Sequence, residues 1–256
     1  MSFSRIWTAG ALLAALALGA CDNGAERPVQ GWVEAELVFV SPDEMGRIEE
    51  LRVKQGDHVN SGDLLFTVDP DLQQADVMMN EASLVNAQKA YDRAQELLKT
   101  AAGTQKTLED AEAALRTAQA RLNSSRTRLQ RRRAFAPADG TIQQVYYRPG
   151  ELVPAGRPVI ALLPPPNLKI RFFVPEERLA QIKYGDTVTV NCDHCQGDAT
   201  AKVSFIASSA EFTPPVIYSL EERSKLVYLV EARPTHPENF RVGQPVDVVL
   251  PQGQPK

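Results

Sequence analysis

The sequence lacks the short motifs by which many nucleotide-binding and hydrolytic enzymes are recognised. Its 256 residues contain no glycine-rich phosphate or dinucleotide motif, no His-Glu metalloprotease motif and no Gly-x-Ser-x-Gly turn. Its three histidines, His58, His194 and His236, are scattered along the chain. We therefore expect a protein that is not an enzyme and that carries no cofactor.

A strong excess of charge of one sign is also missing. The net charge is −4, with 43% hydrophobic and 23% charged residues, which is an ordinary globular composition. Bulk attraction to nucleic acid is therefore not indicated, and we expect no nucleic-acid partner. The length allows one large domain or two to three small ones.

Long apolar runs are absent as well. The apolar run near the N-terminus, residues 6–18, follows the positive Arg5 and is too short to span a bilayer as a stable helix. Residues 1–20 are therefore predicted to be a secretion signal.

Cysteine is rare, and one of the three cysteines directly follows this signal. The residues Leu18-Gly19-Ala20-Cys21 resemble the bacterial lipobox, which implies that Cys21 is lipidated and becomes the mature N-terminus. The aspartate after it, Asp22, resembles the signal for retention in the inner membrane. Several acyl chains anchor a protein stably, whereas one binds only marginally. An ordinary signal peptide with a chance cysteine is the alternative.

Two seven-residue apolar repeats occupy residues 69–134. Each large residue has a small or polar companion three positions later, and the large residues are Val77, Leu84, Tyr91 and Leu98, then Leu108, Leu115, Leu122 and Leu129. Such a repeat keeps one narrow seam facing a partner helix. The two series therefore predict an antiparallel helical hairpin with its tip at residues 101–104. Each arm of about 30 residues would reach roughly 45 Å, so the hairpin should project.

The ends of this hairpin carry their own signals. Asp69 is the expected N-cap of the first helix, with Pro70 at its first position. Pro137 is expected to end the return helix. Five arginines gather near that end, where a solvated cluster suits the helix dipole and contact with an acidic neighbouring subunit is the alternative: Arg126, Arg128, Arg131, Arg132 and Arg133.

An internal repeat flanks the hairpin. Residues 46–68 recur as residues 140–162 at a constant offset of 94, with matches such as Gly56/Gly150 and Gly62/Gly156. Gly-Asp and Gly-Glu turns separate apolar runs in the two copies. Neither copy has enough apolar surface to stand alone, so we expect the two to pair as a small β-sandwich.

Alternating apolar residues resume after the three prolines at 164–166. Strands are expected at residues 168–174, 187–192, 199–206, 226–233 and 246–250, with a short helix at 175–183 and an earlier strand at 31–40. Short strands separated by glycine turns at this spacing predict a small β-barrel.

The paired half-motifs resemble the biotinyl/lipoyl carrier domain. Carriers hold a modified lysine on the turn that joins the halves, but here the hairpin replaces that turn. Its lysines, Lys89, Lys99 and Lys106, lack the Met-Lys-Met or Asp-Lys-Ala surroundings of carriers. A carrier domain of an acyl-transfer enzyme is therefore a less favoured alternative.

A lipoyl-like domain split by a helical hairpin resembles the HlyD-type periplasmic adaptors, also called membrane fusion proteins. This resemblance implies an α+β, mainly β fold: a lipoyl-like β-sandwich split by an antiparallel coiled-coil hairpin and followed by a small β-barrel. The expected divisions are a signal peptide at 1–20, an anchor and linker at 21–30, the first barrel strand and first half-sandwich at 31–68, the hairpin at 69–134, the second half-sandwich at 135–163, and the barrel and tail at 164–256.

The resemblance also implies a role and partners. Such adaptors link an inner-membrane transporter to a TolC-type outer-membrane channel, and they are usually hexameric. Residues 211–215 and 221–228 look like those of adaptors that accompany ABC-type exporters. We therefore expect a periplasmic protein, lipid-anchored to the inner membrane of a Gram-negative bacterium.

The tip of the hairpin carries a spacing that the family uses to contact the channel. The family pattern is Arg-x3-Leu-x6-Ser, and this chain has Arg93, Leu97 and Thr104, with threonine in place of serine. The alternative is that Leu97 is an ordinary helix residue and that Thr104 caps the second helix. Both roles can hold together, because a cap fixes the geometry of a docking tip.

Two further cysteines lie close together at a strand end, in Cys192-Asp-His194-Cys195. In an oxidising periplasm, we expect a disulfide across this turn. A metal site using Cys192, His194 and Cys195 is the alternative, which would make the chain a periplasmic metal-binding lipoprotein. Such a site would usually want a further ligand.

Overall fold

The structure is a computed structural model that describes residues 28–193, 199–212 and 226–251. The chain divides into two compact units, which are taken separately below: Ala35–Leu168, and Met1–Glu34 together with Lys169–Lys256. Within the described residues, no helix combines the length and the apolar character needed to cross a membrane.

The first unit contains a β-sandwich in which the two copies of the internal repeat are interlocked. The first copy supplies β3 (Gly46–Leu51), β4 (His58–Val59) and β5 (Leu64–Val68), and the second supplies β7 (Gly140–Val145), β8 (Leu152–Val153) and β9 (Ile160–Leu163). One sheet has the order β2-β9-β7-β4 and the other β6-β5-β3-β8, with β2 at Val38–Val40 and β6 at Arg133–Phe135. Each copy therefore gives one short strand to the other copy's sheet.

The inward faces of both sheets form one apolar core. Leu65 and Phe66 of the first copy are fully buried in the same cluster as Ile160 and Leu162 of the second copy. The turns recur with the same backbone, since Gly56 (φ 92°) and Gly150 (φ 91°) both adopt the left-handed conformation that glycine tolerates best. Because the core draws on both copies, neither copy can bury its apolar face alone, as the repeat predicted.

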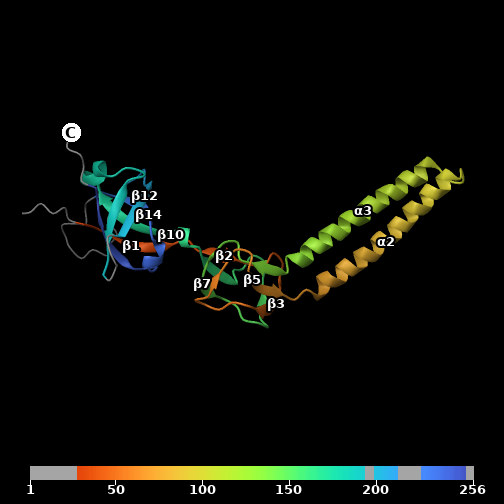
Figure 1. The fold of residues 1–256 in the computed structure, drawn as a ribbon, viewed down its shortest axis with the longest axis horizontal. Helices are drawn as coiled ribbons and strands as arrows, with labels where there is room; N and C mark the ends of the chain where they lie inside the picture. The colour runs from red at the N-terminus through yellow and green to blue at the C-terminus, as the bar shows by residue number, and fades with distance from the viewer. Residues whose placement is uncertain (1–27, 194–198, 213–225, 252–256) are drawn as a thin grey trace, which may run out of the picture. The chain divides into compact units, whose positions relative to one another are not determined.

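The hairpin consists of α2 (Asp71–Lys99) and α3 (Gln105–Gln130), which run antiparallel and side by side (Figure 1). The predicted seam is confirmed. All eight large residues of the two repeats are buried or half-buried, and Val77 and Leu122, with the companions Ala118 and Ser125, are the most enclosed. Positions on the outer faces are exposed, as a two-helix seam requires.

Both predicted base ends of the hairpin were wrong by a few residues. Pro70, not Asp69, occupies the N-cap of α2, although the carboxylate of Asp69 still accepts a hydrogen bond from the Asp71 amide at 3.0 Å. The return helix ends at Gln130, well before Pro137. The reason is β6, because its residues pair with β5 from Leu64↔Phe135 to Thr67↔Arg133 and cannot also be helical.

The second unit is a small barrel. Its seven strands have the order β10-β1-β15-β11-β12-β14-β13, and an additional β10–β14 pairing closes the sheet. The strands are β1 (Val29–Ala35), β10 (Leu168–Pro175), β11 (Thr187–Asn191), β12 (Ala199–Ile206), β13 (Glu211–Phe212), β14 (Leu226–Pro234) and β15 (Pro245–Val249).

Two local predictions for this part of the chain needed correction. The strand expected at 31–40 is split, so that β1 belongs to the barrel and β2 to the sandwich. The short helix expected at 175–183 is a 3-10 helix, Glu176–Gln181, and it directs Ile182 into the core. The fold class is nevertheless confirmed: mainly β, with a long helical hairpin and a barrel.

Candidate functional site

The tip of the hairpin is a tightly hydrogen-bonded turn. Helix α2 ends with Thr100 as C-cap, and the left-handed Ala101 (φ 56°) reverses the chain. The carbonyl of Leu97 accepts hydrogen bonds from the amides of Ala102 and Gly103, both at 2.9 Å. These bonds satisfy a carbonyl that the helix end would otherwise leave without a partner.

Gly103 brings the turn directly onto Leu97. A Cβ atom at Gly103 would lie 3.1 Å from the Cβ of Leu97 and 3.1 Å from the backbone nitrogen of Leu98. A larger residue would therefore push the turn away from the helix. The close approach fixes where the Leu97 side chain sits relative to the start of α3.

Thr104 begins the return helix as a cap. Its hydroxyl accepts a hydrogen bond from the Thr107 amide at 3.2 Å, and the Thr107 hydroxyl accepts one from the Thr104 amide at 3.2 Å. This reciprocal pair is a capping box in which threonine replaces the usual glutamate or glutamine. The capping role expected for Thr104 is therefore present in the structure.

Arg93 and Leu97 lie one turn apart on the same face of α2. Leu97 is 49% exposed. Arg93 is exposed and forms no ion pair or side-chain hydrogen bond with any residue that the structure describes. The tip thus presents a free guanidinium beside an apolar side chain, next to a capped turn.

An exposed ion pair lies near the start of α3. Lys106 pairs with Asp110 one turn later at 2.8 Å. The hydrogen bond that Lys106 donates to this carboxylate, and then the negative charge of Asp110, raise the pKa of Lys106 above its ordinary value.

The other predicted site residues are placed as follows. Cys21 and Asp22 lie outside the described residues, as do His194 and Cys195. Cys192 directly follows β11 and is disulfide-bonded. Because its expected partner Cys195 is not described, the pairing of these two cysteines stays a prediction.

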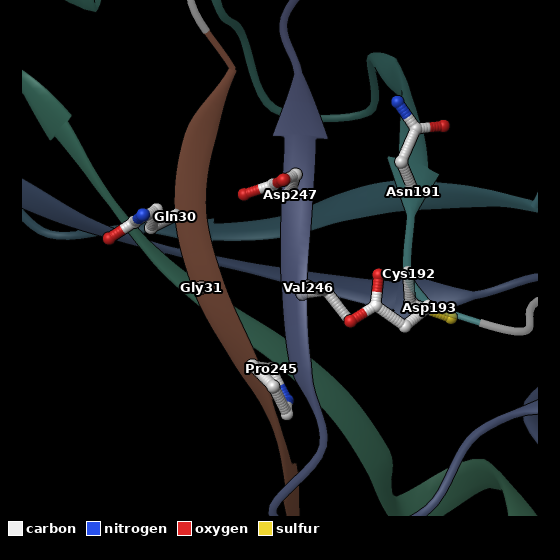
Figure 2. A pocket seen from close by; sticks show the side chains of 8 residues that line it. All are labelled: Gln30, Gly31, Asn191, Cys192, Asp193, Pro245, Val246 and Asp247. Carbon is white, nitrogen blue, oxygen red and sulfur yellow. The ribbon is translucent and has the colours of Figure 1, made fainter.

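Cys192 borders a shallow hollow of about 380 Å³ on the barrel, between β1, β15 and β11. Asp193 and Asp247 contribute the two carboxylates of this hollow. Gln30 and Asn191 lie on opposite sides of β15 and point away from each other (Figure 2). Within the described ranges no group of three or more potential metal ligands occurs.

The lysines considered for a carrier lie on the hairpin helices. Lys99 pairs with Glu96 at 3.5 Å and Lys106 with Asp110, while Lys89 is exposed on α2. A carrier lysine needs a protruding turn of the sandwich, and none of these residues occupies one.

Two residues at the base of the hairpin, Glu44 and Gln73, were not predicted from the sequence. The prediction that Arg132 belongs to a solvated helix end was wrong, because Arg132 lies beyond α3 and is only 8% exposed. The heptad position of Arg132, three residues after Leu129, was the one signal that pointed toward burial.

An interlocked sandwich interrupted by a helical hairpin, together with a separate small barrel, defines the architecture of membrane fusion proteins. The family described as "RND MFP, barrel-sandwich hybrid domain" matches residues 36–163, half of the chain. The chain therefore belongs to the RND/HlyD-type periplasmic adaptor family.

Curated relatives match the same part of the chain. A "UPF0194 membrane protein in asrC 5'region" of Acidithiobacillus ferridurans is 35% identical over 121 residues, 46% of this chain and 36% of the relative. A UPF0194 membrane protein of Citrobacter koseri is 31% identical over 117 residues, 45% of this chain and 35% of the relative. The matched part thus spans about a third of the length of these relatives.

Solved structures share the fold. The membrane fusion protein Spr0693 from Streptococcus pneumoniae R6 has a TM-score of 0.68 at 18% identity, covering 87% of this chain and 97% of that one. A MacA-MexA chimeric protein containing the Pseudomonas aeruginosa MexA α-hairpin domain also has a TM-score of 0.68, at 22% identity, covering 86% of this chain and 78% of that one. At these identities the likeness concerns the fold alone.

Proposed function

We propose that this chain is the non-catalytic adaptor subunit of a tripartite export system. It bridges an inner-membrane transporter to a TolC-type outer-membrane channel in the periplasm. One observation carries this proposal: the tip places the free guanidinium of Arg93 and the half-exposed Leu97 beside a capped turn. The guanidinium of Arg93 and the exposed half of Leu97 have no partner among the described residues, and contact with another protein would give both of them one.

The tip suits the rim of a channel for three physical reasons. The guanidinium of Arg93 has five donors in a rigid fork, which fits backbone carbonyls or carboxylates. Leu97 adds apolar contact one turn away. The capping box and the bonds to the Leu97 carbonyl hold the turn in one conformation before docking, which lowers the entropy lost on binding.

The transporter is proposed to be of the ABC type. This rests on residues 211–215 and 221–228, most of which lie outside the described residues. The mechanism proposed for the adaptor is geometric, so ATP or proton coupling would belong to the transporter. A neighbouring pair of genes for an ATPase and a permease is the expected observation, whereas a lone gene for a proton-driven pump would contradict this part.

Side-by-side assembly of several copies is the second part of the proposal. The face of α2 opposite the seam carries Leu72, Met78, Met79 and Val85, all largely exposed, and no large apolar residue of α3 is exposed to that degree. Asp71, in line with Met78 and Val85 at seven-residue intervals, and Asp76 are exposed on α2, whereas the half of α3 next to the sandwich exposes Arg121 and Arg128. Unlike charges and an unpartnered apolar stripe favour packing of α2 against α3 of a second copy. We propose a hexamer by analogy with the family.

One cross-linking experiment tests both contacts. A photo-activated cross-linker at position 97 is expected to capture an outer-membrane channel protein in cells, and one at position 79 a second copy of this chain. A cross-linker at Gln95, on the opposite side of the helix from Leu97, serves as the matched control. Channel capture from position 95 but not from position 97 would contradict docking through the proposed face.

Lipidation at Cys21 completes the proposal and gives a separate prediction. We expect the chain to take up labelled fatty acid and to sediment with inner membranes, because Asp22 follows the cysteine. Cys21→Ser should abolish labelling and move the protein to the soluble periplasmic fraction, since the anchor supplies the membrane affinity. Labelled wild-type protein in outer membranes would refute the retention role of Asp22, and unlabelled wild-type protein would refute the anchor.

A further inference from the structure

Both arms of the hairpin meet a single carboxylate where they leave the sandwich. Glu44 lies in the loop between β2 and β3. Its Oε2 accepts a hydrogen bond from Gln73 Nε2 in the first turn of α2, at 3.1 Å. The same oxygen lies 3.4 Å from Nη2 of Arg132, which follows α3. Gln73 and Arg132 are each only 8% exposed.

The guanidinium of Arg132 occupies a slot that the sandwich provides. Its Nη1 donates a hydrogen bond to the carbonyl of Met45 at 3.1 Å. A Cβ on Gly46 would lie 2.8 Å from this nitrogen and 2.3 Å from Cγ1 of Val68. Only glycine at position 46 therefore leaves room for the buried cation.

Backbone bonds hold the two connecting segments together at this point. The amide of Val68, just before α2, donates to the carbonyl of Arg132 at 2.8 Å. The amide of Asp69 donates to the carbonyl of Arg47 at 2.9 Å. The helices themselves pack mainly against each other rather than on the strands of the sandwich. These backbone bonds and the side-chain contacts at the base together therefore set the direction of the hairpin.

Glu44, Gln73 and Arg132 form a network at the base of the hairpin in which some buried polar atoms have no hydrogen-bond partner among the described residues. Gln73 Oε1 and Arg132 Nε are buried and form no hydrogen bond with any residue in the described ranges. Partly satisfied buried networks are sensitive to loss of a member, because the remaining groups stay desolvated. Loss of the Glu44 carboxylate would leave Arg132 with the carbonyl of Met45 as its remaining polar contact and Gln73 without its acceptor.

The hairpin amplifies any change of angle at its base. An arm of 29 residues is about 44 Å long, so a tilt of about 10° moves the tip by roughly 8 Å. This displacement exceeds the reach of a hydrogen bond several times over. A docking tip is therefore only as well placed as the contacts at the base allow.

The geometry points to Glu44 as a positioning residue that fixes the direction in which the hairpin leaves the sandwich. Its carboxylate joins both arms to the β2–β3 loop and so sets where Arg93 and Leu97 are presented. The part of this inference that concerns docking rests on the proposed adaptor function. The part that concerns the direction of the hairpin is independent of that function.

The test measures distances between spin labels at Ala102, on the tip, and Ser61, on an exposed turn of the sandwich. Labels on a genetically encoded keto amino acid leave the native cysteines untouched. Glu44→Ala is expected to broaden the distance distribution severalfold, and Glu44→Gln to broaden it less, because the amide still accepts from Gln73. Asp43→Ala is the matched control, since its pair with Arg131 (3.3 Å) is exposed on both sides and its loss should leave the distribution narrow.

A second variant separates positioning from stability. Arg132→Met in the Glu44→Ala background removes the buried cation that Glu44 no longer balances. We expect the melting temperature to recover while the distance distribution stays broad. A narrow distribution in Glu44→Ala, with helical content intact by circular dichroism, would overturn the inference. Broad distances in Glu44→Ala without any channel adduct from position 97 in the wild type would instead refute the proposed docking and leave the role of Glu44 standing.

Discussion

Leu97→Asp and Arg93→Asp, tested separately, are expected to abolish export while leaving the amount, lipidation and melting temperature of the protein near wild type. Leu97 is half exposed and Arg93 has no partner among the described residues, so neither substitution opens a cavity or strands a buried group. An aspartate in the last turns of α2 opposes the helix dipole at a cost of about 0.3–1 kcal/mol, which is small beside the stability of a domain. The loss should therefore arise at the partner, not in the fold.

Gln95→Asp is the matched control for these variants. It adds the same negative charge to the same exposed stretch of α2, but on the opposite side of the helix from Arg93 and Leu97. Export is measured by whether each variant restores growth of a deletion strain on the toxic compounds to which the deletion makes the cells sensitive. Normal complementation by Gln95→Asp and none by Leu97→Asp is the expected result. Normal export by both tip variants would remove the main support for the adaptor function.

The hairpin could be predicted from sequence because its signals are local. A heptad repeat specifies which residues face a partner helix regardless of the rest of the chain, and the seam from Val77 to Leu98 packs as predicted. The end of the return helix was predicted too far along the chain, because Pro137 sets only the last position that the helix could reach. Pairing of β6 with the distant β5 ended the helix earlier, and no local pattern near residue 130 announces that pairing.

The strand order of the sandwich also could not be predicted from local sequence patterns. The offset of 94 identified two matching halves, and their glycine turns adopt matching conformations. The exchange of short strands, with β4 on β7 and β8 on β3, did not follow from it. Strand order depends on contacts between the copies, and alternation within one strand carries no information about its neighbour.

For the candidate site, the tip residues were predicted from a spacing that resembles the family's pattern, whereas the residues at the base were not predicted. Arg93, Leu97 and Thr104 are related by positions within one hairpin, so sequence spacing places them at one end of it. Glu44 stands in a polar loop that looks like a solvated turn in the sequence. Only the arrival of Gln73 and Arg132 from distant parts of the chain gives its carboxylate a role. The contacts of Glu44 could therefore not be predicted from the sequence, because they join residues that are far apart in the chain.

Phe66→Ala is expected to destabilise the sandwich by about 3–5 kcal/mol. Phe66 on β5 is 0% exposed and packs in the core that both repeat copies share. Removing a buried ring loses its transfer free energy and leaves a cavity that rigid neighbours fill only partly. Because opening of one copy uncovers the other, we expect the effect to reach β9, which belongs to the second copy.

Hydrogen exchange at the amides of β9 measures this loss directly, since protection there reports the free energy of opening. Phe66→Ala should accelerate exchange at Ile160 and Leu162 by about 10²- to 5 × 10³-fold, because each loss of about 1.4 kcal/mol is a factor of ten. Phe39→Ala provides the matched control, because Phe39 lies on β2 beside β9 but is 54% exposed, and its removal should change the opening free energy by less than about 1 kcal/mol. Equal acceleration by the two variants, or protection of β9 that survives Phe66→Ala, would show that the second copy holds its strands without the first. The interlocked core would then not be the reason that the chain carries two copies.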